Sequence, residues 1–361
     1  MVPCECDKQQ PTTKQPTTMT MNKQPTTNHD QKGEYMLFDF KKDVPFPEPE
    51  RPKFKFIDLF AGIGGFHLAF HNVGAECVMA SEIDIHARKT YEVNFSKLSP
   101  KLFNEDMLKG DLLKIPVSDI PDFDILCAGF PCQPFSQIGY RRGFLDSHEN
   151  RGNMFFEIAN IIEKKKPHAF FLENVRHLLK HDNGDTFRVI KDVLEGLGYS
   201  FHYKVVKASD YGLPQHRPRV FMVGFRGEKT NNSSFMFPAK KPLIYDMSDI
   251  FQGECEKQIG FTLRVGGRGS KIHDRRNWEF YRVDGSVKRL GVKEGKMMQG
   301  FPLDFVFPVS ESQSMKQLGN SVAVKAIEEV AKQIVQYLKV KNLKYEGILS
   351  MKDYESKLAY V

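Results

Sequence analysis

The chain has few cysteines, no long apolar run and no recognisable leader. Its 361 residues contain six cysteines, whose spacing matches neither a zinc finger nor a disulfide framework, so we expect free thiols and no metal site. No apolar run approaches the length of a membrane span, and the N-terminus lacks the apolar core of a secretory signal. We therefore expect a cytoplasmic protein that does not bind a membrane.

The charge balance is only mildly basic. Lys and Arg number 52 against 45 Asp and Glu, which gives a net charge of +7. Such an excess permits a polyanionic partner but does not require one. With 40% hydrophobic residues, the chain is able to bury a large core.

The N-terminal stretch is polar and rich in proline. The tetrapeptide Gln-Pro-Thr-Thr starts at Gln10, at Gln15 and again at Gln24. This composition offers too little apolar surface to offset the entropy cost of ordering. We therefore predict a disordered polar tail over residues 1–52.

Two strand endings predict a site for a nucleoside-containing cofactor. Residues 54–60 predict a strand that ends in the turn Ala61-Gly62-Ile63-Gly64-Gly65, and a helix follows. A second predicted strand, residues 77–82, ends in Glu82 at the distance where βαβ folds place an acid on ribose hydroxyls. The turn matches neither the dinucleotide fingerprint nor a phosphate loop. A plain βαβ packing turn is the alternative.

Cys132 follows a predicted buried strand, residues 123–128. Pro131 and Pro134 restrict the backbone on both sides of the thiol, which suits a loop that presents one side chain. Residues 137–153 are rich in Gly, Arg and polar residues, which predicts a long loop of the kind used as a lid over substrate. The alternative is a small buried cysteine in a proline-containing turn.

Charged side chains are predicted at the same sheet edge. The apolar residues 169–172 predict a strand that delivers Glu173 to this edge, where it either acts with the thiol or caps the next helix. Arg217 and Arg219 alternate at strand spacing and therefore point the same way. They suit an oxyanion, a base oxygen or a phosphate, and two surface arginines are the alternative.

Residues 226–287 lose apolar periodicity and predict a loop-rich segment. Four arginines in it stand among glycines and aromatic residues, namely Arg264, Arg268, Arg275 and Arg276. This mixture is typical of a groove that follows a nucleic-acid backbone and reads base edges. A solvated basic surface is the alternative. A long amphipathic helix is predicted at 323–339.

Six separate motifs, in family order, resemble those of the DNA (cytosine-5)-methyltransferases. They are Asp58-Leu59-Phe60-Ala61-Gly62-Ile63-Gly64-Gly65, Gly129-Phe130-Pro131-Cys132-Gln133, Glu173-Asn174-Val175, Gln215-His216-Arg217-Pro218-Arg219, Gln299-Gly300-Phe301-Pro302 and Gly319-Asn320-Ser321-Val322. The resemblance implies an α/β, S-adenosylmethionine-dependent methyltransferase fold, with a Rossmann-like doubly wound sheet and a small, loop-rich target-recognition domain. The implied divisions are a first catalytic and cofactor-binding part at 53–225, the recognition domain at 226–288, a return to the catalytic domain at 289–340 and an extension at 341–361.

The resemblance also assigns catalytic roles. The family's cysteine adds to C6 of cytosine so that C5 can attack the methyl group of S-adenosyl-L-methionine, and Cys132 matches that cysteine. Glu173 matches the glutamate that meets N3 of the ring, and Arg217 and Arg219 match arginines that orient the base. The target base leaves the duplex to reach them.

The implied ligand contacts fall into two sets. The cofactor set is Phe60, Ala61, Gly62, Ile63, Gly64, Gly65, Glu82, Ile83, Asp111, Pro131, Met154, Asn320, Ser321 and Val322. The DNA set is Gln133, Ser136, Gln215, Arg264, Arg268, Arg275 and Arg276. From the residues alone, either Asp106 or Asp111 can end the third strand, and the resemblance favours Asp111. Ile83 stands where the family commonly has tryptophan.

By resemblance, the chain is the modification enzyme of a restriction-modification system that methylates a short duplex DNA sequence. We expect a monomer, with any cognate restriction endonuclease acting independently. An RNA methyltransferase is a second reading, because one branch of the family acts on transfer RNA, but that branch's Cys-Phe-Thr motif does not occur here. A silent DNA-binding module is a third, and the intact Cys132, Glu173 and Arg217 argue against it.

Overall fold

A mostly parallel sheet organises the chain in its computed structural model, which describes residues 54–131, 154–266 and 269–345, with side chains as far as Lys341. The strands are β1 (Phe54–Leu59), β2 (Ala75–Ser81), β3 (Leu108–Lys109), β4 (Ile125–Gly129), β5 (Ala169–Val175), β6 (His202–Lys207) and β7 (Pro218–Phe225). Their order in the sheet is β3-β2-β1-β4-β5-β7-β6. β1 to β5 run parallel, whereas β7 is antiparallel to β5 and β6 to β7. The carboxyl ends of the parallel strands therefore share one edge with the start of β7.

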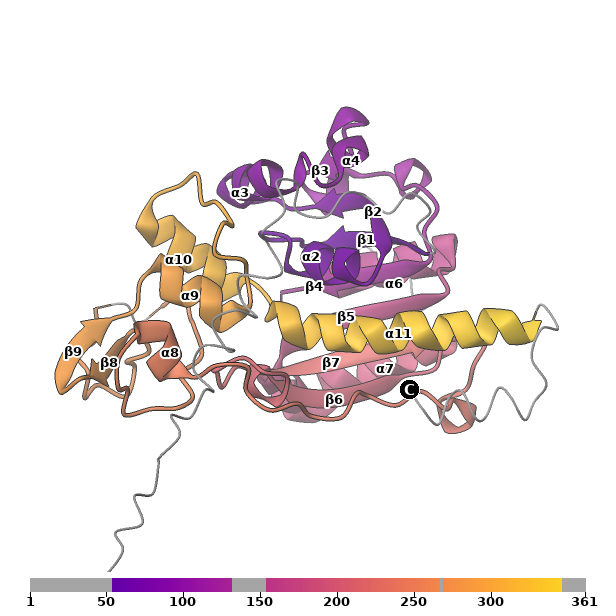
Figure 1. Cartoon of the computed structure of the whole chain (residues 1–361). Coiled ribbons are helices and arrows are strands. Elements are labelled where there is room, and N and C mark those ends of the chain that lie inside the picture. The colour runs from indigo at the N-terminus through magenta and orange to yellow at the C-terminus, as the bar shows by residue number, and fades with distance from the viewer. Residues whose placement is uncertain (1–53, 132–153, 267–268, 346–361) are drawn as a thin grey trace, which may run out of the picture.

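Helices cover both faces of this sheet (Figure 1). α2 (Gly65–Asn72), α3 (Ile85–Phe95) and α11 (Val324–Tyr345) contribute to the core on one face, and α6 (Met154–Lys165) and α7 (Asp185–Gly196) to the core on the other. Strand residues alternate between the two cores, as Phe171 and Phe170 of β5 do. This is the doubly wound α/β arrangement predicted from the sequence.

Short helical elements connect these layers. They are α4 (Pro100–Asn104), η1 (Leu112–Lys114), η2 (Val117–Asp119), η4 (Arg176–Gly184), η5 (Ala208–Asp210) and η6 (Thr230–Asn232). Among the described residues, no helix combines the length and apolar character needed to cross a bilayer.

A small lobe stands beside the edge of the sheet (Figure 1). It consists of α8 (Met247–Phe251), the hairpin of β8 (Phe280–Val283) and β9 (Ser286–Arg289), α9 (Val292–Gln299) and α10 (Glu311–Asn320). Trp278 is fully buried in this lobe, and its Nε1 donates to the carbonyl of Gly266 over 2.9 Å. The lobe is thus a packed unit despite its many loops.

Contacts of the chain cross both predicted boundaries of the recognition domain, at 226 and at 288. Just after the predicted boundary at 226, the chain still packs on α11, because Phe235 stacks edge-on against Tyr337. At the other end, α9 and α10 lie with the lobe, and Tyr245 donates to the carbonyl of Met297 in α9. The segment after 226 is irregular and mostly exposed, with Phe235 and Tyr245 as its buried hydrophobic side chains, and the chain returns to the sheet with α11.

Candidate functional site

A cavity of about 420 Å³ opens at the carboxyl edge of the sheet. It is lined by residues that follow β1, β2 and β4, by the end of β5, by the start of β7 and by α10. The predicted site residues among them are Phe60, Gly62, Ile63, Glu82, Pro131, Glu173, Arg217, Arg219 and Asn320. Segments far apart in the sequence thus meet at one edge, as expected for an open α/β sheet.

The turn after β1 is held in an unusual backbone shape. Phe60, Gly62 and Gly64 have φ of 56°, 58° and 86°. The N–H of Gly62 donates to Oε2 of Glu82 over 2.8 Å, and the N–H of Asp84 donates to Oε1 over 2.8 Å. The Glu82 carboxylate is thereby fixed at the cavity with further lone pairs available to hydroxyl donors.

Glycines of this turn serve different purposes. A Cβ on Gly62 would meet no protein atom within 4 Å, so the space beside it is open to a ligand. A Cβ on Gly65 would lie 2.5 Å from Cγ2 of Val322, which packs against the start of α2. Ala61, Gly64, Gly65, Ser321 and Val322 form the buried support behind the cavity and do not line it.

The remaining predicted cofactor residues lie at the margins. Asp111 follows β3 and accepts from the N–H of Leu113 over 3.1 Å, whereas Asp106 precedes β3 and pairs with Lys109 at 3.0 Å. Of the two, only Asp111 lies at the carboxyl edge, although it does not line the cavity. Met154 starts α6, and the Ile83 side chain is 69% exposed beside Glu82.

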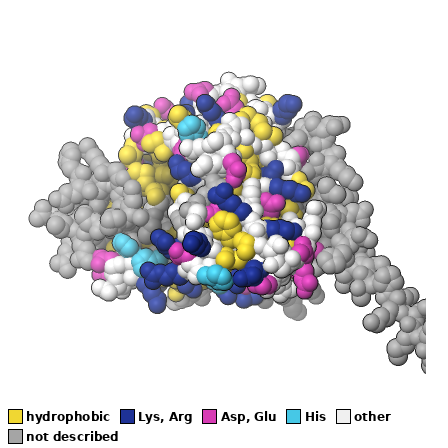
Figure 2. Space-filling view, turned by 90° about the vertical axis from the view of Figure 1, so that its left-hand side faces the viewer, with side chains coloured by type: hydrophobic (Ala, Val, Ile, Leu, Met, Phe, Trp, Pro, Cys, Tyr) yellow, Lys and Arg dark blue, Asp and Glu magenta, His cyan; other side chains and the backbone are white. Residues whose placement is uncertain are grey.

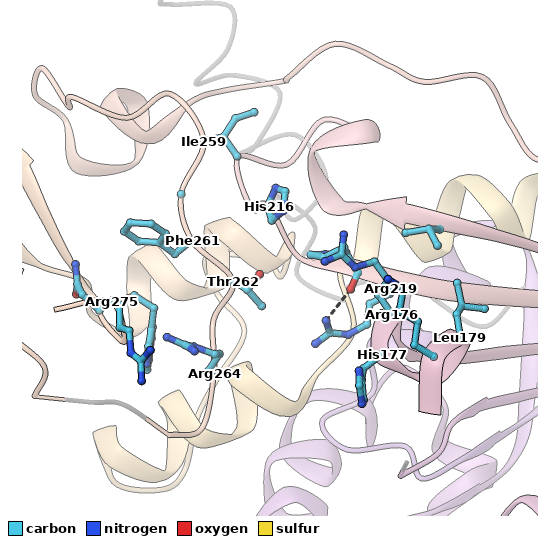
Figure 3. A pocket seen from close by; sticks show the side chains of 16 residues that line it. Arg176, His177, Leu179, His216, Arg219, Ile259, Phe261, Thr262, Arg264 and Arg275 are labelled. Carbon is cyan, nitrogen blue, oxygen red and sulfur yellow. Dashed lines mark hydrogen bonds between the residues drawn. The ribbon is translucent and has the colours of Figure 1, made fainter. Parts of the chain in front are cut away.

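A second, open cleft of about 1210 Å³ separates the sheet edge from the small lobe. Figure 3 shows Arg219 and the η4 side chains on one side, with Arg264 and Arg275 on the other. The residues lining the described cleft include no carboxylate. Viewed from the lobe side, Lys, Arg and His side chains gather on this face (Figure 2). The cleft therefore suits an extended polyanion.

Several cleft residues were not predicted from the sequence. Arg176, His177 and Lys180 of η4 line it together with His216. The basic residues that directly follow Glu173-Asn174-Val175 were the sequence signal that could have indicated them. Of the predicted arginines, Arg276 does not line the cleft and pairs with Asp274 at 2.7 Å. Arg268 lies outside the described residues.

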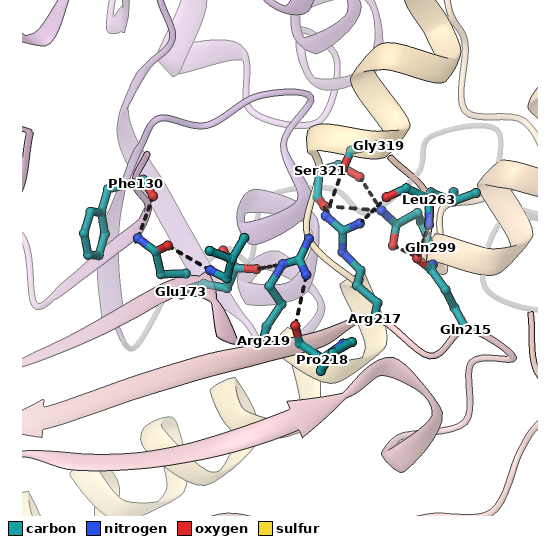
Figure 4. Close-up of polar contacts among 12 residues, drawn as sticks. Phe130, Glu173, Gln215, Arg217, Pro218, Arg219, Leu263, Gln299, Gly319 and Ser321 are labelled. Atoms are coloured by element: carbon teal, nitrogen blue, oxygen red, sulfur yellow. Dashed lines mark hydrogen bonds and ion pairs between the residues drawn. The ribbon is translucent and has the colours of Figure 1, made fainter. Parts of the chain in front are cut away.

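Glu173 lies near the carboxyl end of β5, beside Arg219. Nε of Arg219 lies 2.9 Å from Oε1 of Glu173, and both side chains are largely buried (Figure 4). Nδ2 of Asn174 donates to the carbonyl of Phe130 over 2.9 Å, which fixes the chain close to Cys132. Cys132, Gln133 and Ser136 themselves lie outside the described residues.

Arg217 is buried, and no carboxylate of the described residues forms an ion pair with it. Its guanidinium donates to the carbonyls of Leu263, Gly319 and Ser321, and its Nε has no hydrogen-bond partner in the part of the chain that the structure describes. Burial, with the neighbouring positive charge of Arg219, lowers the pKa of Arg217. The site thus holds a desolvated cation surrounded by backbone oxygens.

The predicted contact of Gln215 to DNA does not fit its position. Gln215 is fully buried. Its Nε2 donates to the carbonyl of Met298 and to Oε1 of Gln299, and its Oε1 accepts from the N–H of Leu263. Because these groups are engaged inside the protein, Gln215 supports the junction with the small lobe instead.

In the described ranges, His, Cys, Asp and Glu side chains nowhere gather in a group of three or more that would hold a metal.

Comparisons with known proteins agree with this geometry. The model of the C-5 cytosine-specific DNA methylase family matches residues 54–264 and 257–336. The chain is 39% identical to the type II methyltransferase M.SsoII of Shigella sonnei, over 84% of this chain and 85% of that protein. It is 38% identical to the type II methyltransferase M.HhaI of Haemophilus parahaemolyticus, over 80% and 96%.

A solved structure shares the fold. The S. pombe Dnmt2 methyltransferase superposes with a TM-score of 0.60 at 20% identity, covering 79% of this chain and 99% of that one. The family match spans the sheet, the cavity and the small lobe. The chain therefore belongs to the C-5 cytosine-specific DNA methylase family.

Proposed function

We propose that the chain transfers a methyl group from S-adenosyl-L-methionine to C5 of a cytosine in a short, specific duplex DNA sequence. One observation carries the proposal: the glycine turn, Glu82 and the Glu173–Arg219 pair all line the same cavity. The basic cleft opens beside this cavity, and Arg219 lines both.

The cavity residues fit this cofactor. The open space at Gly62 admits a ligand against the backbone, and the fixed Glu82 carboxylate suits two ribose hydroxyls. We assign Phe60 and Ile83 to the adenine ring, Asp111 to its amino group, and Asn320 to the far wall with Ser321 and Val322 behind it. When bound, the cofactor supplies an electrophilic methyl group.

The protein's own residues prepare the cytosine. We propose that the Cys132 thiolate adds to C6, so that the electron pair of the C5–C6 double bond becomes available at C5. Glu173 shares a proton with N3 as negative charge develops there, and Arg219 orients both the carboxyl group and the base. After methyl transfer, a water molecule takes the C5 proton, and the electron pair of that C–H bond restores the double bond and expels the thiolate from C6.

The target base has to leave the duplex, because its C6 face is stacked inside the helix. The cleft holds the duplex between η4 and the lobe, while the cavity receives the base. We assign base reading to the lobe side, with Arg264 and Arg275, and positioning on phosphates to η4. In this proposal the recognition unit is the small lobe, from about residue 247.

We propose that the enzyme acts as a monomer and as the modification partner in a restriction-modification system, since its relatives are type II methyltransferases. All residues assigned to the reaction come from one chain. A cognate endonuclease would act on the same sequence independently. Light scattering that shows an obligate dimer would contradict the monomer.

The test is incorporation of labelled methyl from S-adenosyl-L-methionine into mixed-sequence duplex DNA and, in parallel, into transfer RNA. We expect labelling of DNA alone, lost in Cys132→Ala while binding of S-adenosylhomocysteine is kept. Bisulfite conversion then maps the target sequence. Labelling of RNA alone would overturn the substrate, and labelling that survives Cys132→Ala would overturn the covalent mechanism.

A further inference from the structure

One arginine of the small lobe presents its side chain to the cleft. Arg275 is exposed and lines the cleft, and Figure 3 shows it on the lobe side, across from Arg219. Among the described residues it forms no hydrogen bond or ion pair, and none of those that line the cleft is a carboxylate. The N–H donors of its guanidinium are therefore available to a ligand.

Two other arginines at this end of the lobe are bonded within it. Arg264 donates from Nη2 to the carbonyl of Arg276 over 2.6 Å. Arg276 in turn binds the carboxylate of Asp274 through two nitrogens, Nε at 3.1 Å and Nη2 at 2.7 Å. The Asp274 carboxylate is thereby held by Arg276 and not by Arg275, its neighbour in sequence.

Hydrogen bonds on both sides fix the turn that carries Arg275. Before it, the carboxylate of Asp274 also accepts from the backbone N–H of Arg276 over 2.8 Å. After it, the buried Asn277 donates to the carbonyl of Phe280 and accepts from the N–H of Phe280, both over 3.0 Å. A guanidinium on such a fixed backbone loses little freedom on binding, which suits a directional contact.

A directional guanidinium in a cleft for duplex DNA has one preferred base. In the major groove, guanine presents two acceptors, N7 and O6, side by side, and arginine binds both at once. A contact to phosphate needs positive charge but no fixed orientation, and Arg176 and Lys180 on the opposite wall supply that charge. The lobe side of the cleft thus has the arginine that suits a base.

We infer that Arg275 reads a guanine in the major groove of the target sequence, and that the Asp274–Arg276 pair is a positioning device that keeps Asp274 away from Arg275. This inference rests on the proposed function and makes it more specific. Arg275 selects the base, whereas Arg264 supports the turn through its bond to Arg276. The recognised sequence then contains a guanine whose N7 the enzyme needs.

The test uses duplexes that carry the mapped target and differ at one guanine. 7-Deazaguanine removes the N7 acceptor and keeps base pairing, whereas inosine, the matched control, lacks only the amino group in the minor groove. Affinity is measured at constant salt with S-adenosylhomocysteine, which has no methyl group to transfer. With the wild type, we expect 7-deazaguanine at one position to weaken binding by about 5-fold to 150-fold, the range of a bidentate pair. Inosine at that position should leave binding nearly unchanged.

Three variants locate the contact. In Arg275→Ala, the guanine and 7-deazaguanine duplexes should bind equally, because the group that distinguishes them is gone. Arg276→Ala should reduce the dependence on N7, since Asp274 then becomes available to Arg275, and Arg276→Lys should restore part of it. As control, Arg282→Ala removes an equal charge from β8, where Arg282 lies 3.8 Å from Glu256, and should keep the full dependence.

The opposite results are equally specific. If Arg275→Ala weakens binding to all duplexes alike and the dependence on N7 persists, Arg275 contacts a phosphate and the inference is wrong. Sensitivity to inosine instead of 7-deazaguanine would place the contact in the minor groove, and a wild type that needs no guanine N7 would also overturn the inference. Full N7 dependence in Arg276→Ala would overturn the positioning role. A wild type that binds and methylates no duplex would instead overturn the proposed function.

Discussion

Glu173 accepts from Arg219 at the point where β5 and β7 lie side by side, with Nε of the arginine 2.9 Å from Oε1 of the carboxylate. The pair lines the cavity next to the cleft. Arg219 occupies one carboxylate oxygen and leaves the other to face a ligand. Arginine thus orients the acid that we assign to N3 of the cytosine.

Replacing the acid tests this assignment. Glu173→Gln keeps the shape but removes the acid that shares a proton with N3, and we expect kcat to fall by about 10²-fold to 10³-fold, as for other single groups that stabilise developing charge. Binding of S-adenosylhomocysteine should stay unchanged. Single-turnover methyl transfer measures the effect, with the exposed Glu105→Gln as control. A Glu173→Gln rate close to wild type would remove Glu173 from the chemistry.

Glycines at the turn after β1 make two different predictions. Gly62→Ala places a Cβ in open space at φ 58°, so we expect a stability loss of only about 1–2 kcal/mol from the left-handed backbone, together with weaker cofactor binding. Gly64→Ala also sets its Cβ 2.3 Å from the Phe95 ring, which adds about 1–3 kcal/mol of overpacking.

Urea unfolding and calorimetry with S-adenosylhomocysteine separate the two effects at the turn. The larger stability loss should belong to Gly64→Ala. Relative to the stability that each variant loses, Gly62→Ala should lose more affinity for S-adenosylhomocysteine than Gly64→Ala does. If Gly62→Ala binds the ligand as the wild type does, the open space beside Gly62 is not where the cofactor lies.

Particular residues show how much of the site could be predicted from the sequence. Glu82 and Glu173 were placed correctly because apolar strands ending in a carboxylate share one edge of a parallel sheet. The burial of Gln215 and the backbone partners of Arg217 could not be predicted, because strand spacing shows that two side chains point the same way but not which carbonyls they meet. Those carbonyls belong to Leu263, Gly319 and Ser321, which only the tertiary fold brings near.

The basic residues of η4 give a prediction about salt. If Arg176 and Lys180 contact phosphates, Arg176→Ala and Lys180→Ala should each weaken binding at physiological salt and lower the slope of log K against log salt by about one. Preference among DNA sequences should not change. Binding titrations at several salt concentrations measure the slope, and Lys101→Ala on α4 removes an equal charge far from the cleft as control. A changed sequence preference with an unchanged slope would place η4 on bases instead.

A buried histidine behind the turn predicts a loss of stability in acid. His67 is fully buried, with Nδ1 2.5 Å from the Tyr91 hydroxyl and Nε2 2.9 Å from the Ser99 hydroxyl. Burial, helped by the nearby His71, holds the pKa of His67 well below its ordinary value. The folded state therefore keeps this ring neutral while the unfolded chain protonates it near pH 6.5.

The direction in which stability changes with pH follows from which state takes up the proton. Above about pH 6.5, His67 is neutral in both the folded and the unfolded state, so it adds no pH dependence to the stability. Below about pH 6.5, only the unfolded state binds the extra proton, and the stability falls by up to about 1.4 kcal/mol per pH unit. We expect His67→Gln to lose this part of the slope between about pH 6.5 and pH 5, whatever its overall stability. Urea unfolding across that range measures the difference, with the exposed His273→Gln as control. Because Gln does not titrate, an identical slope in His67→Gln and wild type would mean that the folded protein protonates His67 as readily as the unfolded chain does.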